Sequence, residues 1–138
     1  MNHNRKNAQY YINEEKRTIT CVLQNCQNDL YEVINSIDCD CNMRFDCCFD
    51  MNYHELKMKK VYVGVAKCAP DDTWDVEYGK LLAFHRAKHN HDADFFRKAQ
   101  HFIQSFDDLL VEYCTGINRI GDKFRKNADR RRDELEIE

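Results

Sequence analysis

The sequence predicts an α+β protein in which an N-terminal antiparallel β-sheet packs on two or three C-terminal α-helices. Two observations support this prediction. Segments rich in β-branched residues, or with alternating apolar and polar residues, lie mainly between positions 17 and 68. Segments whose apolar residues recur at helical spacing fill most of positions 73–135.

The length and composition predict one domain with an ordinary surface. The chain has 138 residues and no linker rich in Pro, Gly or Ser. Residues 1–16 are polar apart from Tyr10–Ile12, so a loosely ordered arm is expected there. A charged fraction of 33% and a net charge of −3 favour neither nucleic acid nor an anionic membrane as a partner. No apolar leader opens the chain and no stretch is long enough to span a bilayer, so we expect a cytoplasmic protein.

The β half contains three predicted strands and one predicted helix. Arg17–Leu23 is rich in β-branched residues and predicts a strand. Met43–Met51 alternates apolar and polar residues, and Lys60–Cys68 repeats this pattern, so these two segments are expected to pair as an antiparallel hairpin. Asp29–Ile37 has helical spacing and is interpreted as a short helix, with a strand as the alternative.

Several residues of the α half predict where helices begin and end. Pro70 ends the last strand and Asp71–Thr73 offer capping oxygens, so a helix is expected to begin near Thr73. Asn90–Asp92 is expected to break it, and the strongest helical period follows over Ala93–Tyr113. Gly116 suits the C-terminal cap of this second helix, and a last, increasingly charged helix is expected to fray or to lie on another subunit.

The chemistry-bearing residues favour binding over catalysis. The sequence has only four glycines and contains no phosphate-binding loop, nucleophile elbow or dinucleotide-binding motif. No catalytic residue and no cofactor is therefore predicted. The eight cysteines lack the paired spacing of a zinc site and are interpreted as free thiols, with no metal site expected. His85 and His89 lie four residues apart, and Cys68 precedes a helix start, so an enzyme acting through these three is the least favoured alternative.

One stretch of the predicted helices has the parts of a nucleotide site. Phe84, Arg86, His89 and Asn90 offer an aromatic platform, a cation, an imidazole and an amide. Basic residues also cluster around Lys67 and around Arg119 near the C-terminus. Such clusters are most often solvated faces, and phosphate recognition is the functional alternative. A regulatory nucleic-acid-binding protein that uses the C-terminal cluster is the second hypothesis.

The run Val63–Ala87 resembles a pattern of small phage proteins. The pattern is G-x-A-K/R-C, then P-x-D-x-aromatic-D, then G-x-x-L-A-x-x-R-A, which this chain carries from Gly64 to Cys68, from Pro70 to Asp75 and from Gly79 to Ala87. It is similar to the phage anti-Thoeris sponge family, whose members sequester cyclic ADP-ribose-type signals made by TIR-domain immune enzymes.

This resemblance implies both an architecture and a function. It implies a sheet packed on two long helices, dimers that assemble into larger rings, and a signal pocket built between subunits. Phe84 would stack on adenine, and Arg86 and Asn90 would contact ribose or phosphate. The implied protein is viral, acts in the host cytoplasm, and sequesters a cyclic nucleotide without degrading it. Cyclic oligonucleotide signals of related defence systems are a second ligand class implied by the resemblance.

The apolar stripe within Phe95–Tyr113 is longer than one thin sheet can cover. We therefore expect a homo-oligomer, either a dimer or a ring of dimers.

Overall fold

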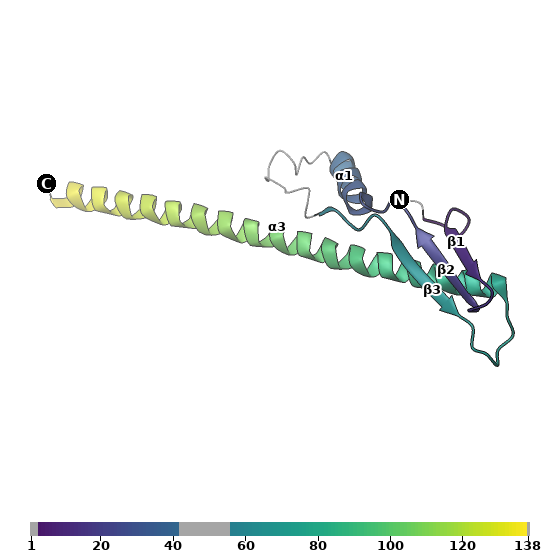
Figure 1. The fold of residues 1–138 in the computed structure, drawn as a ribbon. Helices are drawn as coiled ribbons and strands as arrows, with labels where there is room; N and C mark the ends of the chain where they lie inside the picture. Colours follow the sequence, from purple (N-terminus) through teal and green to yellow (C-terminus); the bar gives the residue numbers. More distant parts are fainter. Residues whose placement is uncertain (1–2, 42–55, 138) are drawn as a thin grey trace. The chain divides into compact units, whose positions relative to one another are not determined.

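The protein is an α+β protein, as the sequence predicted, and a computed structural model describes its residues 3–41 and 56–137 (Figure 1). In chain order the described elements are β1 (Gln9–Asn13), β2 (Thr18–Leu23), α1 (Asp29–Cys41), β3 (Tyr62–Lys67) and α3 (Val76–Ile137). The chain divides into two compact units, Met1–Gln100 and His101–Glu138. The single-domain interpretation of the sequence stays a prediction.

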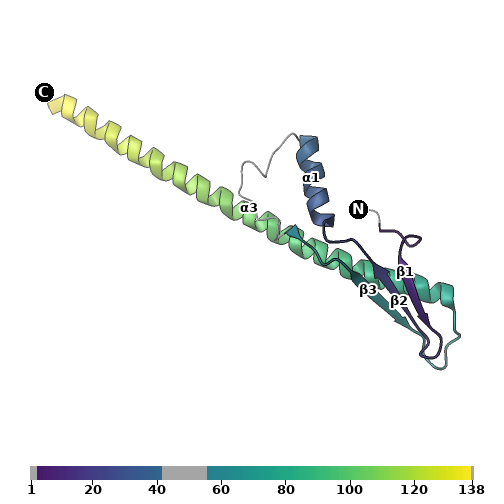
Figure 2. The ribbon, with the colours of Figure 1, turned by 45° about the horizontal axis from the view of Figure 1, so that its top comes forward.

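The three strands form one antiparallel sheet in the order β1-β2-β3. In both views the strands run beside the first turns of α3 (Figures 1 and 2). Alternate residues of β2 are buried on the face toward α3, beginning with Ile19, and alternate residues of β3 do the same, beginning with Tyr62. The alternation that predicted β3 therefore marks the buried face of the sheet, and β2, which was predicted from its β-branched residues, alternates in the same way.

Strand β1 corrects the expectation of a loosely ordered arm over residues 1–16. Its residues pair with β2 along their whole length, from Gln9 opposite Val22 to Asn13 opposite Thr18. The segment carries only a short apolar cluster, and much of its ordering comes from backbone hydrogen bonds to a neighbouring strand. The residue types of the segment therefore do not predict its pairing with β2.

The other predictions for the first half have different outcomes. The strand within Arg17–Leu23 and the helical interpretation of Asp29–Ile37 are confirmed by β2 and α1. The described neighbour of β3 is β2. The predicted strand Met43–Met51 and its hairpin with β3 lie outside the described residues.

Small residues let β3 approach α3 closely. A Cβ atom added at Gly64 would lie 2.2 Å from the carbonyl oxygen of Ala83 and 2.2 Å from the backbone nitrogen of Ala87. Ala83 and Ala87 are themselves fully buried. The contact therefore brings backbone against backbone, and a side chain at position 64 would prevent it.

Helix α3 begins at Val76, three residues later than expected. The Oδ1 atom of Asp75 accepts a hydrogen bond from the backbone N–H of Tyr78 over 3.1 Å, and the Asp75 carbonyl accepts one from Gly79 over 2.9 Å. Asp75 is therefore the N-cap residue, since the cap is the residue whose side chain satisfies an unpaired N–H of the first turn.

The helix breaks expected near Asn90–Asp92 and at Gly116 are wrong, because α3 continues through both points to Ile137. The polar side chains make contacts that leave the helix backbone intact. The Asn90 amide donates to the carbonyl of Val63, and Asp92 accepts from the Lys88 ammonium one turn earlier. Gly116 has no positive φ, so it does not cap. The expected fraying is also wrong for the described residues, which stay helical.

Among the described residues, no helix combines the length and the apolar character that crossing a membrane requires.

Candidate functional site

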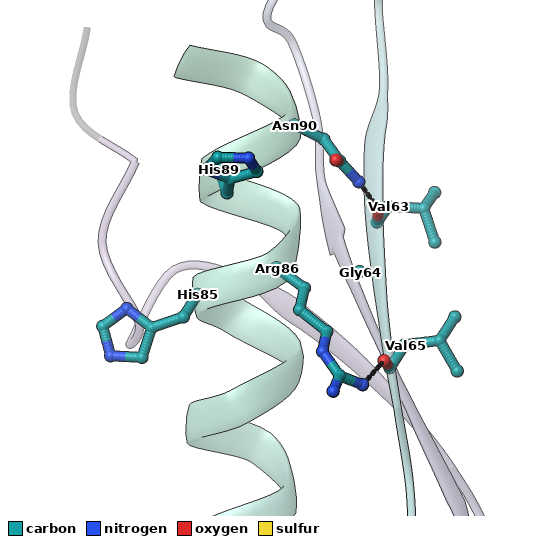
Figure 3. Close-up of a pocket in the computed structure, with 7 residues that line it drawn as sticks. All are labelled: Val63, Gly64, Val65, His85, Arg86, His89 and Asn90. Atoms are coloured by element: carbon teal, nitrogen blue, oxygen red, sulfur yellow. Dashed lines mark hydrogen bonds between the residues drawn. The ribbon is translucent and has the colours of Figure 1, made fainter. Parts of the chain in front are cut away.

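A groove of about 480 Å³ runs between the outer edge of β3 and one face of α3 (Figure 3). Its walls are Val63, Gly64 and Val65 of the strand and four side chains of the helix, which are His85, Arg86, His89 and Asn90. All four helix residues are exposed, so the groove opens to solvent. Its lining contains one permanent cation, two imidazoles, an amide and no carboxylate, which favours an anionic ligand.

Two of these helix side chains hold the strand edge. The Arg86 guanidinium donates a hydrogen bond to the Val65 carbonyl over 2.6 Å, and the Asn90 amide donates one to the Val63 carbonyl over 2.9 Å (Figure 3). These carbonyls point away from β2, because the backbone groups of successive residues in an edge strand point alternately toward and away from the neighbouring strand. The two bonds occupy edge carbonyls that could otherwise pair with a strand of another chain. A guanidinium has five N–H donors, so the bond to Val65 leaves donors for a ligand.

The groove gathers three of the six ligand residues that the sequence predicted, Arg86, His89 and Asn90, and adds His85. Phe84 is half-buried on α3 with its ring 5.9 Å from that of His85, and it is not among the lining residues. Lys67 is exposed at the end of β3, also outside the lining. Arg119 is exposed in the second compact unit.

Cys68 lies in the loop before α3 and contacts a cation. The guanidinium of Arg17 donates to the Cys68 sulfur over 3.2 Å, to the Pro70 carbonyl over 2.8 Å and to the Asp72 carbonyl. As expected, Cys68 follows β3 and precedes α3, although α3 begins only at Val76, eight residues later. Arg17 therefore organises this loop, and Cys68 is one of its contacts.

A second constellation lies in the interior of the first compact unit. The ligand atoms of His3, Cys26, Asp29 and His91 all lie within 4.8 Å of one another. Cys26, Asp29 and His91 are buried, and His3 is half-buried. Burial, reinforced by the negative charge of Asp29, raises the pKa of the Cys26 thiol to about 11. Sequence reasoning missed this cluster, because its members carry no recognisable spacing.

The thiols whose side chains the structure describes, Cys21, Cys26, Cys68 and Cys114, form no disulfide. This agrees with the free-thiol interpretation for these four positions.

These features define a small α+β protein with an open basic groove at a sheet edge and a buried His/Cys/Asp cluster. No family model matches the chain, and neither a curated protein nor a solved structure matches it.

Packing accounts for much of the pattern within Val63–Ala87. Gly64 and Ala66 face the helix from β3, and Ala83 and Ala87 are buried on α3. Gly79 lies against the Ile19 side chain, which an added Cβ would approach to 2.5 Å. These small residues specify a close strand-to-helix contact. Of the fixed positions of the pattern, Gly64 and Arg86 also line the groove.

Proposed function

We propose that the protein binds and sequesters a cyclic nucleotide signal, a cyclic ADP-ribose isomer made by TIR enzymes, in the groove between β3 and α3. The supporting observation is that the groove brings Arg86, His89 and Asn90 together in a volume of about 480 Å³. Pockets for small molecules span about 300–1,000 Å³, so a dinucleotide-sized ligand fits this range.

The lining suits the separate parts of such a ligand. Arg86 offers fork geometry to diphosphate oxygens, and the imidazole N–H groups of His85 and His89 are further donors in the same lining. The Asn90 amide can bond a ribose hydroxyl through its oxygen while its nitrogen stays on Val63.

Sequestration without turnover is part of the proposal. The residues that line the groove include no carboxylate and no thiol. A protein that competes with a receptor for a signal needs affinity alone, which a pre-formed polar pocket supplies. The resemblance of Val63–Ala87 to phage sponges supports a viral protein that acts in the host cytoplasm against an immune signal, with cyclic oligonucleotides as the second ligand class.

Titration calorimetry tests the proposal directly. The purified protein is titrated with cyclic ADP-ribose isomers, with linear ADP-ribose and NAD as controls. Arg86→Gln keeps a donor for the Val65 carbonyl but loses the charge and the fork, so binding of the cyclic isomer should fall by at least about tenfold. Arg125→Gln, an exposed arginine paired with Asp122 on the second compact unit, should bind like the wild type.

The fate of the ligand completes the test. Heat denaturation of the complex should return the intact cyclic compound to solution, identified by mass spectrometry. A linear or hydrolysed product would contradict sequestration. No binding to any isomer would contradict the ligand class and favour nucleic acid, tested by the salt dependence of RNA and DNA binding.

We also propose that two copies of the chain pair through the second compact unit. Seven of its apolar residues recur at alternating intervals of three and four, which is the spacing of a coiled-coil seam: Ile103, Phe106, Leu110, Tyr113, Ile117, Ile120 and Phe124. Ile117 is 66% exposed and Phe124 is 67% exposed, so a single chain leaves much of the seam in water. The identical seam of a second copy has the same spacing and can cover it.

Light scattering after size exclusion tests this pairing. The wild type should have the mass of a dimer or a multiple of it. Ile117→Asp with Ile120→Asp should shift the mass to the monomer, because both side chains lie in the seam. The matched control is Val111→Asp, which alters a residue 60% exposed but off the seam. A monomeric wild type, or a seam variant with unchanged mass, would rule the pairing out.

A further inference from the structure

The buried cluster draws on four separate parts of the first compact unit. His3 precedes β1, Cys26 lies in the turn between β2 and α1, Asp29 is the first residue of α1, and His91 lies on α3. Each offers one ligand atom, and the four atoms lie within 4.8 Å of one another. We propose that His3, Cys26, Asp29 and His91 bind one zinc ion in a closed, four-coordinate structural site.

The donor set selects the metal. A thiolate, two imidazoles and a carboxylate are the ligands of tetrahedral zinc, whereas calcium and magnesium take oxygen donors. Zinc bonds of about 2.0–2.3 Å place tetrahedral donors roughly 3.3–3.8 Å apart. The Asp29 Oδ2 atom now lies 2.6 Å from His3 Nε2 and 2.7 Å from His91 Nε2. Spreading these atoms to zinc spacing takes side-chain movements of about 1 Å.

The two carboxylate contacts of His91 match those of a metal-bound imidazole. Its Nε2 lies 2.7 Å from a carboxylate oxygen of Asp29, and its Nδ1 lies 2.8 Å from one of Asp92. A neutral imidazole has one N–H and can donate to only one of them. The ring is 0% exposed. With zinc on Nε2, the Nδ1–H donates to Asp92 and every contact is satisfied.

Asp92 is then the outer partner that orients the ligand. A metal-bound histidine ordinarily donates its other N–H to a carboxylate, which fixes the ring and its tautomer. Asp92 is itself held by the Lys88 ammonium at 2.9 Å. The His91 ring also packs edge-on to Tyr62 and is stacked near Phe95, with ring centres 5.2 Å and 6.3 Å away. The ligand is therefore held in place before any metal arrives.

The backbone positions the other ligands. The Asp29 N–H donates to the Cys26 carbonyl over 3.2 Å, which closes a turn that places both side chains on one side. The Cys26 N–H donates to the Lys60 carbonyl over 3.1 Å, which ties this turn to the chain just before β3. His3 then closes the site from the segment before β1. Zinc would thus join the N-terminal segment, α1 and α3, a role suited to a small core.

Metal content and cobalt spectroscopy test the site. The full chain, with any affinity tag removed, is expected to bind one zinc per chain after incubation with zinc and desalting. Cobalt in place of zinc should give the visible absorption of a four-coordinate site and a thiolate-to-cobalt charge-transfer band. Cys26→Ser should abolish the charge-transfer band, whereas Cys68→Ser should retain it.

Two milder variants keep the test decisive if Cys26→Ser fails to fold. His3→Gln removes the ligand at the edge of the cluster, and Asp92→Asn removes the outer carboxylate. Both should weaken zinc affinity in a competition with a chelator, Asp92→Asn by about 10–100-fold. His89→Gln, an exposed histidine on the same helix, should leave the affinity unchanged.

Three results would overturn the proposal. The first is a folded wild type that takes up neither zinc nor cobalt, which would make the cluster a hydrogen-bonded network. The second is a charge-transfer band that survives in folded Cys26→Ser. The third is a wild-type zinc affinity in both His3→Gln and Asp92→Asn. None of these measurements depends on nucleotide binding.

Discussion

Gly64→Ala tests the close contact between β3 and α3. The added methyl would lie 2.2 Å from the Ala83 carbonyl oxygen and 2.2 Å from the Ala87 backbone nitrogen, whereas ordinary contact begins at 3.4 Å. The clashing atoms belong to a helix backbone, so they cannot rotate away. Strand and helix must separate by more than an ångström, which also lengthens the Arg86 bond to Val65.

The expected cost follows from this geometry. Inserting one methylene into a packed core typically costs about 1–3 kcal/mol. Because neither side of this contact can yield by a side-chain rotation, we expect the upper end, a loss of about 3 kcal/mol in the free energy of unfolding. Native domains have only about 5–15 kcal/mol in total, so the variant should be folded but markedly less resistant to urea.

Urea unfolding followed by the fluorescence of Trp74, the only tryptophan, is the assay. Gly79→Ala is the graded control, because its added methyl meets the flexible end of the Ile19 side chain at 2.5 Å. Rotation of that side chain and the higher helix propensity of alanine should keep the net change within about 1 kcal/mol. Gly121→Ala has nothing within 4 Å and should be neutral or stabilising.

A Gly64→Ala protein as stable as the wild type would refute the reasoning. It would mean that β3 and α3 do not approach as closely as the structure shows. Equal losses in Gly64→Ala and Gly79→Ala would also contradict it, since backbone and side-chain obstacles would then be equivalent.

Three further predictions concern single side chains of the first compact unit. Asp75→Ala removes the N-cap acceptor of α3 and should lower the free energy of unfolding by about 1 kcal/mol, with a smaller loss for Asp75→Asn, both measured in urea. Burial acts to raise the pKa of Asp94, but hydrogen bonds from Tyr62 and Arg97 outweigh it and hold that pKa below its ordinary value. Ionised Asp94 therefore stabilises the fold above about pH 4, the ordinary carboxyl value, and this contribution is lost as pH falls through the folded pKa. Asp94→Asn should flatten the acid loss of stability in urea titrations, and parallel pH curves would contradict this. Arg17→Met should speed proteolysis of the loop before α3, because the guanidinium bonds three groups there; an unchanged cleavage rate would show that the bonds do not hold the loop.

The candidate groove was partly predictable from the sequence. Arg86, His89 and Asn90 lie within five positions on a helix, and the helical period brings such neighbours onto adjacent turns. Phe84 is half-buried on α3 and is not among the lining residues, and its role as a base-stacking side chain stays a prediction. The strand wall was not predictable, since the contact between β3 and α3 depends on how the chain folds back.

The helix ends show the limit of local signals. Asn90, Asp92 and Gly116 have the chemistry of helix stops, yet α3 passes through all three. The side chain of Asn90 is occupied by the β3 edge, and that of Asp92 by Lys88 and His91. A capping residue ends a helix only when its side chain is available to the backbone, and its other contacts, such as that of Asn90 with Val63, decide this.

The sequence by itself determined the α+β class, strands β2 and β3, helix α1 and the helical character of the C-terminal half. These follow from periods of two or 3.6 residues and, for β2, from β-branched residues, which are all properties of short segments of the chain. Tertiary structure alone decided the pairing of β1, the continuity of α3 and the meeting of His3, Cys26, Asp29 and His91. The four cluster residues are distant in sequence and become neighbours only when burial of the core brings their segments together, whereas β1 pairs with the nearby β2 through backbone groups that residue type does not specify.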